Sequence, residues 1–366
     1  MSPNKRTGRK RDYVGVLSSV FAIVIGLLVG FVILLICNPS QALPGFVTIL
    51  TGAFTHGLKG VGQVFYYATP IILTGLSVGF AFKTGLFNIG TPGQFIVGAF
   101  AAVYVGIMWT GLGRIQWAVA LLAAILGGAL WGMVPGVLKA CFNVNEVIAS
   151  IMMNYIGMYM VNWIVKSYKP LFNNLRNESR NVAATAQIPK MGMDKLFPES
   201  SVGGGILLAV AAVLLIWVIL NKTTFGYELK AVGFNRDAGR YAGINEKRNI
   251  IMSMVIAGAI AGMAGGLLYL AGTGKHIEIK DVLAAEGFTG ISVALLGLSH
   301  PIGVLFSGLF IAYLTAGGFY LQLFEFSTEI IDIIVAVIIY FSAFALIVKT
   351  ILTRMNHKRE KGGGRI

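Results

Sequence analysis

The chain has 366 residues, of which 56% are hydrophobic and only 12% are charged. Soluble domains are about 25% charged, so this composition excludes a soluble globular protein and indicates a polytopic membrane protein. The net charge of +14 lies in tails and loops rather than on a soluble module, so it does not indicate a nucleic-acid-binding protein.

Basic residues precede the first apolar run. Residues 1–13 hold five Lys or Arg residues and one acid, which places this basic tail in the cytoplasm. The apolar run 14–37 is too long for the core of a signal peptide, and no small-residue cleavage site follows it. It is therefore expected to be a retained first transmembrane helix.

More apolar segments follow, and most approach the length of about 20 residues that spans a membrane. They are 64–82, 95–112, 115–138, 147–165, 204–220, 250–271, 288–298, 302–316 and 329–351. The segments 288–298 and 302–316 are short and can be half-helices on either side of Ser299, His300 and Pro301. The expected fold is all-α, with about ten transmembrane helices in a domain at 14–351.

Polar stretches between the helices set the orientation. The stretch 166–203 is too polar to span and, by counting helices, is an external loop in which short surface helices are expected. The loop 221–249 holds six basic and three acidic residues, so it is expected in the cytoplasm. Residues 352–366 form a second basic tail, which places the C-terminus in the cytoplasm as well.

The sequence GLFNIGTPGQ at 85–94 interrupts the apolar pattern. Its glycines and proline disfavour regular helix, so a broken second helix is expected here. Non-helical backbone survives at membrane depth only where it is buried in protein or lines a polar cavity. The segment is therefore a candidate substrate path, with Phe87, Asn88, Gly90, Gly93 and Gln94 as its residues. Packing of the two amides between helices is the alternative.

Further candidates for the path lie within or beside other helices. Neutral amides such as Asn145 and Asn154 suit an uncharged substrate that forms hydrogen bonds, and they could equally hold helices together. Glu146 is expected at a helix N-terminus, where its carboxylate favours the positive end of the dipole and a structural role is as well supported. Phe288, like Phe87, could stack on a planar ligand or simply pack against neighbours.

Motifs for catalysis or ATP binding are missing from the sequence. It contains no HExxH, GxSxG or metal-binding spacing, and no intramembrane acidic relay for proton-driven transport. The GTGK at 272–275 is not a P-loop, because Tyr269 and His276 stand where glycine and Ser or Thr are required. An enzyme is therefore not expected, nor a cofactor bound to this chain, and transport would need an external energy source.

The segment GYELKAVGFNRDAGRYAGI at 226–244 mixes charges and small residues in an otherwise apolar protein. Its pattern predicts one short helix that ends near Gly233 and a second that ends near Gly243. Such a surface helix can dock into a partner, and a solvated loop is the alternative. Docking would explain why small apolar residues are exposed there, namely Ala231, Val232, Ala238 and Ala242. The candidate docking residues are Tyr227, Glu228, Lys230, Ala231, Val232, Gly233, Asn235, Ala238 and Gly243.

Glycine repeats indicate close helix packing. A double GxxxG motif occurs at 128–136 and another at 258–266. Such motifs let helix backbones approach closely in a membrane, where small residues rather than hydrophobic exclusion drive association. They predict packing and carry little information about function.

Together, GLFNIGTPGQ at 85–94, NEVIASIMMNY at 145–155, GYELKAVGFNRDAGRYAGI at 226–244 and GFTGISVALLGLSHPIGV at 287–304 resemble the membrane permeases of ABC importers. The resemblance extends over about residues 64–320 in the family's order. It is strongest to the branch that handles ribose, branched-chain amino acids and nucleosides, and within it to nucleoside permeases that depend on a basic membrane lipoprotein. The chain departs from this branch at Pro92, where an acidic residue is common.

The resemblance implies an import system in a bacterial cell membrane. A second permease subunit, usually a different chain, would complete the path, an external lipoprotein would bind the substrate, and two copies of a cytoplasmic ATPase would bind ATP and Mg. The loop 221–249, with its motif 226–244, would be the coupling region that fits into an ATPase groove. The 85–94 break would face the path.

Nucleoside import is the first hypothesis on this basis. A permease for a simple sugar or a branched-chain amino acid has the same fold and stays open. An autonomous channel or secondary carrier is disfavoured by the partner-like 226–244 segment and the missing acidic relay. A membrane-embedded enzyme would need a catalytic constellation that the sequence does not contain.

Overall fold

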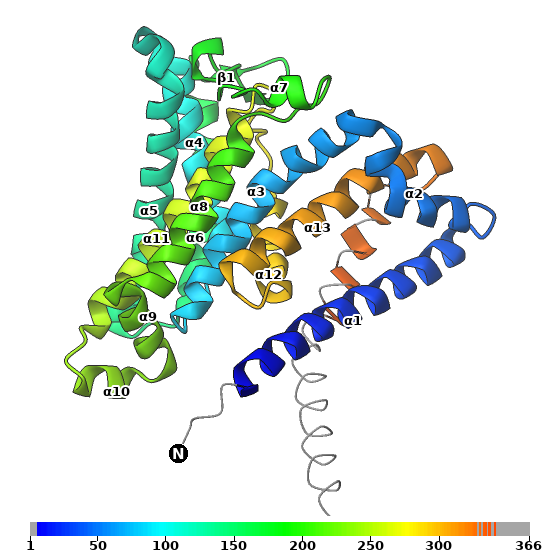
Figure 1. The fold of residues 1–366 in the computed structure, drawn as a ribbon. Coiled ribbons are helices and arrows are strands. Elements are labelled where there is room, and N and C mark those ends of the chain that lie inside the picture. Colours follow the sequence, from blue (N-terminus) through cyan, green and yellow to red (C-terminus); the bar gives the residue numbers. More distant parts are fainter. Residues whose placement is uncertain (1–5, 328, 331, 335, 338–339, 342–366) are drawn as a thin grey trace, which may run out of the picture. The chain divides into compact units, whose positions relative to one another are not determined.

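The computed structural model describes residues 6–327, 329–330, 332–334, 336–337 and 340–341 (Figure 1). The chain divides into two compact units by its internal contacts. The main unit is His56–Tyr313, and the terminal unit joins Met1–Thr55 to Leu314–Ile366. The described residues are mostly helical with very little sheet, as the sequence predicts.

The main unit contains most of the long helices. They are α3 (Gly57–Lys83), α4 (Thr91–Met108), α5 (Gln116–Phe142), α6 (Glu146–Ser167), α8 (Gly205–Lys222), α11 (Glu246–Tyr269), α12 (Ala285–Leu296) and α13 (Pro301–Phe319), the last of which runs into the terminal unit. Each predicted segment from 64–82 to 302–316 overlaps one of these helices. A turn at Leu298 and Ser299, both with positive φ, joins α12 to α13.

Shorter elements of the main unit lie in its polar stretches. They are η1 (Thr110–Ile115), β1 (Phe172–Asn173), β2 (Glu178–Ser179), η2 (Ala184–Ala186), α7 (Met193–Leu196), α9 (Thr224–Phe234) and α10 (Arg236–Tyr241). The strands β1 and β2 form a small antiparallel hairpin that the sequence did not predict. In Figure 1 this hairpin and α7 lie at one end of the main unit, and α9 and α10 lie at the other.

Helix α11 is the centre of the main unit, because it packs against α3, α4 and α5. The two double GxxxG motifs meet there: a Cβ on Gly128 of α5 would lie 2.2 Å from the carbonyl oxygen of Gly258 of α11. A Cβ on Gly262 would lie 2.2 Å from the carbonyl oxygen of Ala124. The predicted backbone-to-backbone packing is thus confirmed, and it brings α11 into the interior.

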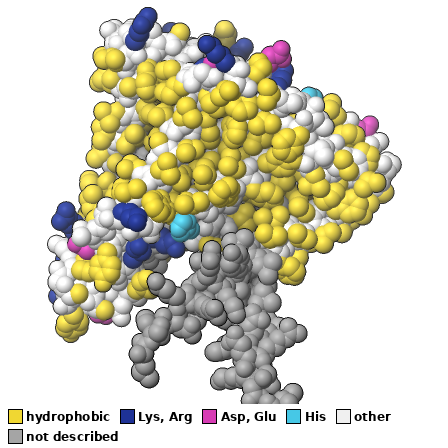
Figure 2. Space-filling view, in the orientation of Figure 1, with side chains coloured by type: hydrophobic (Ala, Val, Ile, Leu, Met, Phe, Trp, Pro, Cys, Tyr) yellow, Lys and Arg dark blue, Asp and Glu magenta, His cyan; other side chains and the backbone are white. Residues whose placement is uncertain are grey.

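The described residues contain seven helices that are long and apolar enough to cross a membrane, together with the apolar stretch Ile23–Cys37 of α1 and the shorter apolar helices Ala42–Thr55 and Ala285–Leu296. Figure 2 shows hydrophobic side chains covering the flank of the main unit, with Lys and Arg side chains at its two ends. This distribution fits a body immersed in lipid, where an apolar belt faces the hydrocarbon. The total of ten spans and the cytoplasmic location of both termini stay predictions.

The terminal unit begins with helices that the sequence predicted only in part. Its elements are α1 (Arg6–Cys37), α2 (Ala42–Thr55), η3 (Tyr320–Phe324) and the end of α13. Helix α2 has 14 residues, fewer than a span needs, so a search for spans misses it. A Cβ on Gly317 would lie 2.4 Å from the carbonyl oxygen of Ile49, so α2 and the end of α13 pack closely. The predicted tail 352–366 and much of the predicted helix 329–351 lie outside the described residues.

Candidate functional site

Helix α3 ends at Lys83 and α4 begins at Thr91, so residues 84–90 form an interrupted segment between them. The predicted break is confirmed, although its last residues, 91–94, form the first turn of α4. Gly85 opens the segment with φ +72°, a conformation that L side chains rarely adopt. The Thr84 hydroxyl bonds the carbonyl oxygen of Ala81 at 2.7 Å and also the Ser253 hydroxyl of α11.

The interrupted segment returns from the end of α3 into the middle of the main unit. A Cβ on Gly287 of α12 would lie 2.6 Å from Cα of Pro92, and one on Gly290 would lie 2.6 Å from the carbonyl carbon of Thr74. Thr74 lies nine residues before Lys83, the last residue of α3. The contact between α12 and Thr74 is therefore about 14 Å from the end of α3, measured along the helix. Pro92 sits in the first turn of α4, where the missing N–H costs nothing and the fixed φ suits the helix. Pro92 therefore has a structural role at the start of α4.

Asn88 and Gln94 bond each other through both ends of their amides, an arrangement called the amide clasp below. Asn88 Nδ2 donates to Gln94 Oε1 at 2.9 Å, and Gln94 Nε2 donates to Asn88 Oδ1 at 3.1 Å. Asn88 Oδ1 also accepts from the Gly90 N–H at 3.2 Å. Asn88 is 0% and Gln94 1% exposed, so in this conformation both amides are satisfied within the protein.

Asn154 of α6 supports the same turn from the other side. Its Oδ1 accepts from the Gly93 N–H at 2.9 Å, and its Nδ2 donates to the carbonyl oxygen of Ile89 at 3.0 Å. Gly93 has to be glycine here, since a Cβ would lie 2.8 Å from Cα of Asn154. Backbone groups freed by the break are thus paired by side chains, as irregular backbone inside a membrane protein requires.

The remaining predicted path residues do not join the clasp. Asn145 caps α6 by accepting from the Val147 N–H at 2.9 Å. Glu146 forms an ion pair with Lys139 of α5 at 2.8 Å. The helix-start position predicted for Glu146 is confirmed, and its ion pair ties the end of α5 to the start of α6, about 12 Å along the helix from Asn154.

Two phenylalanines differ in exposure. Phe87 is half-buried and stacks on Phe82 of α3, with the ring centroids 5.2 Å apart and the planes 13° apart. Phe288 is 41% exposed on α12, in the second turn of that helix. Of the predicted path residues with large side chains, Phe288 therefore offers the most surface to a ligand or a partner.

Sequence reasoning missed the small hydroxyls around the clasp. Ser77 of α3 donates to the carbonyl oxygen of Ala257 at 2.7 Å and accepts from Asn88 Nδ2 at 3.5 Å. Ser150 of α6 is fully buried, and its hydroxyl has no hydrogen-bond partner among the described residues. Serines are common in apolar helices, so only the position of Ser150 within NEVIASIMMNY could have pointed to it.

The 226–244 segment forms the two predicted short helices. Thr223 caps α9 by accepting from the Gly226 N–H at 3.1 Å, and Asn235 caps α10 by accepting from the Ala238 N–H at 3.1 Å. Gly243 follows α10 with φ +78°, the conformation in which glycine commonly ends a helix. Both caps explain why the charged segment folds into helices rather than a loop.

The outer face of these helices carries exposed aromatic side chains. Tyr227 is 71%, Phe234 92% and Tyr241 94% exposed. Among the predicted docking residues, Asn235, Ala238 and Gly243 are also exposed, Glu228, Lys230, Ala231 and Gly233 are half-buried, and Val232 is buried. These exposed aromatic side chains make this face a candidate interaction surface.

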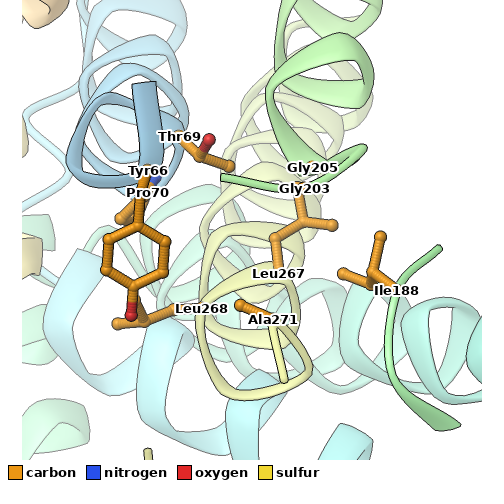
Figure 3. A pocket seen from close by; sticks show the side chains of 9 residues that line it. All are labelled: Tyr66, Thr69, Pro70, Ile188, Gly203, Gly205, Leu267, Leu268 and Ala271. Atoms are coloured by element: carbon orange, nitrogen blue, oxygen red, sulfur yellow. The ribbon is translucent and has the colours of Figure 1, made fainter. Parts of the chain in front are cut away.

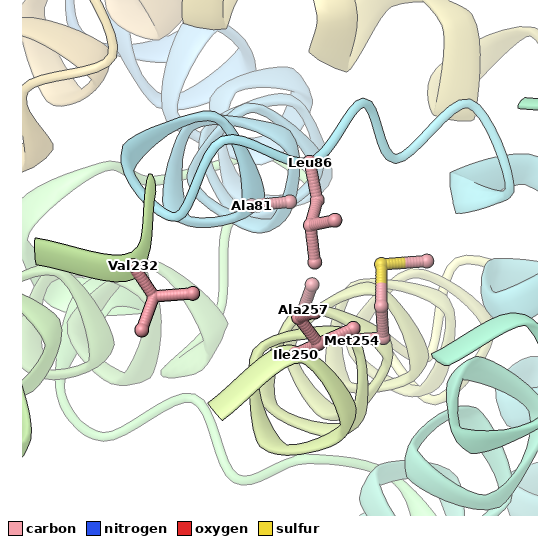
Figure 4. Close-up of a cluster of buried hydrophobic side chains, with 6 residues drawn as sticks. All are labelled: Ala81, Leu86, Val232, Ile250, Met254 and Ala257. Carbon is pink, nitrogen blue, oxygen red and sulfur yellow. The ribbon is translucent and has the colours of Figure 1, made fainter. Parts of the chain in front are cut away.

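The expectation that Val232 is exposed for a partner is wrong. It is 4% exposed and belongs to a buried cluster with Ala81, Leu86, Ile250, Met254 and Ala257 (Figure 4). The figure shows Val232 of α9 and Leu86 of the interrupted segment pointing into the same space above α11. The error arises because Leu229 and Val232, three residues apart, lie on the same side of α9, and that side faces inward.

A small pocket lies near the other end of the main unit, between α3, α11 and the polar stretch 166–203 (Figure 3). Its lining includes Tyr66, Thr69, Ile188 and Leu267, and none of the predicted path residues. It is mostly apolar, so it offers few groups that could orient a polar ligand. Among the described residues, no group of three or more His, Cys, Asp or Glu side chains could hold a metal ion.

An ion pair between Lys275 and Glu286, 2.9 Å apart, joins the loop before α12 to the start of that helix. Burial by itself lowers the pKa of Lys275, but the Glu286 carboxylate more than offsets this and holds the pKa above its ordinary value. Lys275 therefore stays charged at physiological pH. The pair fixes the first turn of α12, which packs on Pro92 at the clasp.

Residues 60–343 match the family described as branched-chain amino acid transport system / permease component. The chain is 38% identical to the guanosine ABC transporter permease protein NupP of Bacillus subtilis (strain 168), over 93% of this chain and 96% of that protein. It is 34% identical to the nucleoside ABC transporter permease protein NupB of Lactococcus lactis subsp. cremoris (strain MG1363), over 93% of each chain. It is also 32% identical to the glucose ABC transporter permease protein TsgB13 of Haloferax volcanii, over 81% of this chain and 78% of that protein. No solved structure matches the chain significantly.

Proposed function

Because this chain belongs to the branched-chain amino acid transport system / permease component family, we propose that it forms half of the translocation path of an ATP-driven nucleoside importer. It is a multi-pass protein of the bacterial plasma membrane. The observation that carries the substrate assignment is the similarity to the guanosine and nucleoside permeases over 93% of the chain. The half-buried ring of Phe87 beside the break would suit a planar substrate.

The second candidate function is a permease for a simple sugar or a branched-chain amino acid. The glucose permease of Haloferax volcanii is 32% identical over 81% of the chain, and the family description names branched-chain amino acids. The glucose permease matches a smaller share of this chain than the two nucleoside permeases do, so nucleosides are the better-supported substrate class.

Competition for uptake separates these substrates. Cells that express the complete system are given labelled uridine with a hundredfold excess of unlabelled guanosine, glucose or leucine. We expect guanosine to suppress uptake and the other two to leave it unchanged. Suppression by glucose or leucine alone would contradict the nucleoside assignment, and uptake by this chain alone in liposomes without ATP would contradict the ATP-driven mechanism.

ATP hydrolysis belongs to a separate subunit in this proposal, with ATP and Mg bound there. Two copies of that ATPase, a second permease subunit, which we propose is a different chain, and an external substrate-binding lipoprotein complete the system. The exposed aromatic surface on α9 and α10 supports a docking role for the 226–244 segment. The ring of Phe234, 92% exposed, would be its main anchor.

Replacing Phe234 by aspartate is expected to release the ATPase. Aromatic anchors typically contribute about 2 kcal/mol or more to an interface, which corresponds to roughly thirtyfold in affinity. Co-purification of the ATPase with the permease measures the loss. Leu175, 96% exposed in the loop that is expected outside, provides the matched control Leu175→Asp. Equal recovery of the ATPase with both variants would place the docking surface elsewhere.

A further inference from the structure

At Gly233, helix α9 touches the interrupted segment backbone to backbone. A Cβ on Gly233 would lie 2.7 Å from the carbonyl carbon of Thr84 and 2.9 Å from the Gly85 nitrogen. Conversely, a Cβ on Gly85 would lie 2.8 Å from the carbonyl oxygen of Gly233. Both positions are glycine, and the contact joins residues far apart in the chain. No side chain separates the two backbones, so α9 cannot move toward the interrupted segment without displacing that segment.

Side chains continue this contact toward the clasp. Val232, beside Gly233, and Leu86, beside Gly85, pack in the buried cluster over α11 (Figure 4). Thr84 bonds Ser253, and Ser77 bonds the carbonyl oxygen of Ala257, both on α11. Leu86 is two residues before Asn88, whose amide closes the clasp. The path from α9 to the clasp therefore consists of a backbone contact, a buried apolar cluster, hydrogen bonds to α11 and the short chain segment from Leu86 to Asn88.

We infer that Gly233 and Gly85 are positioning residues for transport: they couple displacement of α9 to the interrupted segment and so to the Asn88–Gln94 clasp. The inference rests on the proposed function, since it needs an external motor that moves α9. The clasp would then open or close when the ATPase changes its nucleotide state. The contact acts through backbone position, so its role is separate from that of the exposed aromatic residues that would bind the motor.

The test replaces Gly233 by alanine in the complete complex and measures ATP hydrolysis and nucleoside uptake together. Coupling between sites commonly corresponds to about 5- to 150-fold, so we expect uptake per ATP hydrolysed to fall by about tenfold. Gly85→Ala should act in the same direction. Gly274→Ala is the matched control for backbone strain, because Gly274 has φ +73° against +72° for Gly85 and no atom lies within 4 Å of its added Cβ.

A second readout follows the interrupted segment itself. Cys37 and Cys141, both exposed, are replaced by serine, and Ile89→Cys is labelled with a small maleimide with and without trapped ATP. We expect the labelling rate to depend on nucleotide in the otherwise unmodified protein and to lose this dependence with Gly233→Ala. Val232→Ala, which removes packing without adding a clash, should weaken the dependence and serves if Gly233→Ala fails to assemble.

The outcomes separate the inference from the proposed function. A complex with unmodified glycines that shows no ATP-dependent nucleoside uptake would overturn the function itself. Normal uptake in that complex, with an unchanged ratio of uptake to hydrolysis in Gly233→Ala, would overturn the inference alone. Labelling of Ile89→Cys that does not respond to nucleotide would do the same, because the segment would then not move with the motor.

Discussion

Replacement of Asn88 by alanine is expected to stop uptake and to lower the thermal stability of the purified complex. The change leaves both polar ends of the Gln94 amide and the Gly90 N–H without their bonds to Asn88. Gln94 is 1% exposed, so water cannot replace the lost partner. Each buried group left unpaired costs about 1–3 kcal/mol, and we expect a total loss of about 2–5 kcal/mol.

The size of this loss depends on whether the freed Gln94 amide finds another hydrogen-bond partner. Hydrogen bonds between membrane helices contribute only about 0.6 kcal/mol on average, because a freed group commonly finds another partner. That average suits an amide near a helix surface, and it does not suit Gln94, which is 1% exposed and whose Nε2 would lie only 3.3 Å from a Cβ on Gly132 of α5. The larger penalty for an unpaired buried group therefore decides the outcome.

Asn162→Ala is the matched control for this prediction. Asn162 is an amide of α6, only partly buried, and its Nδ2 donates to the carbonyl oxygen of Lys280 at 3.0 Å, away from the break. It should shift the melting temperature little and preserve uptake. If Asn88→Ala retained wild-type stability and raised only the KM for the nucleoside, Asn88 would contact substrate directly and the clasp would not be its main role.

The sequence predicts the helices of the main unit well, because apolar runs near 20 residues are a strong signal. The predicted segment 147–165 lies within the observed Glu146–Ser167, and the two helices expected in 226–244 are both present. Helix α2 was missed because 14 residues fall below the length of a span. Its packing against Gly317 depends on residues more than 250 positions away.

The sequence predicted which residues belong to the candidate site, but it did not predict which of them bond one another. The amides Asn88, Gln94 and Asn154 could be selected because polar groups are costly in an apolar chain. That Asn88 and Gln94 bond each other depends on the non-helical path of residues 84–90, which brings positions six apart together. The contact between Gly85 and Gly233 joins two motifs that looked independent in sequence, and no local pattern encodes such a distant pairing.

Replacement of Gly262 is expected to have the largest effect on folding. A Cβ there would lie 2.2 Å from the carbonyl oxygen of Ala124 and 2.9 Å from Cα of Gly128, while one on Gly98 of α4 would lie 2.3 Å from Cα of Gly262. Three helices, α4, α5 and α11, therefore meet at one residue. Helices in lipid associate through packing rather than through exclusion of water, so close approach is what holds them together.

Gly262→Ala should lower stability by about 1–3 kcal/mol, the usual cost of overpacking, and Gly262→Leu should prevent accumulation of the protein in the membrane. Immunoblots of membrane fractions and thermal melts of the purified protein measure the two effects. Gly111, where an added Cβ meets no atom within 4 Å, supplies the controls Gly111→Ala and Gly111→Leu. Wild-type levels and melting temperature for Gly262→Leu would mean that α11 does not pack at this point, and the route from α9 to the clasp would lose the helix on which it rests.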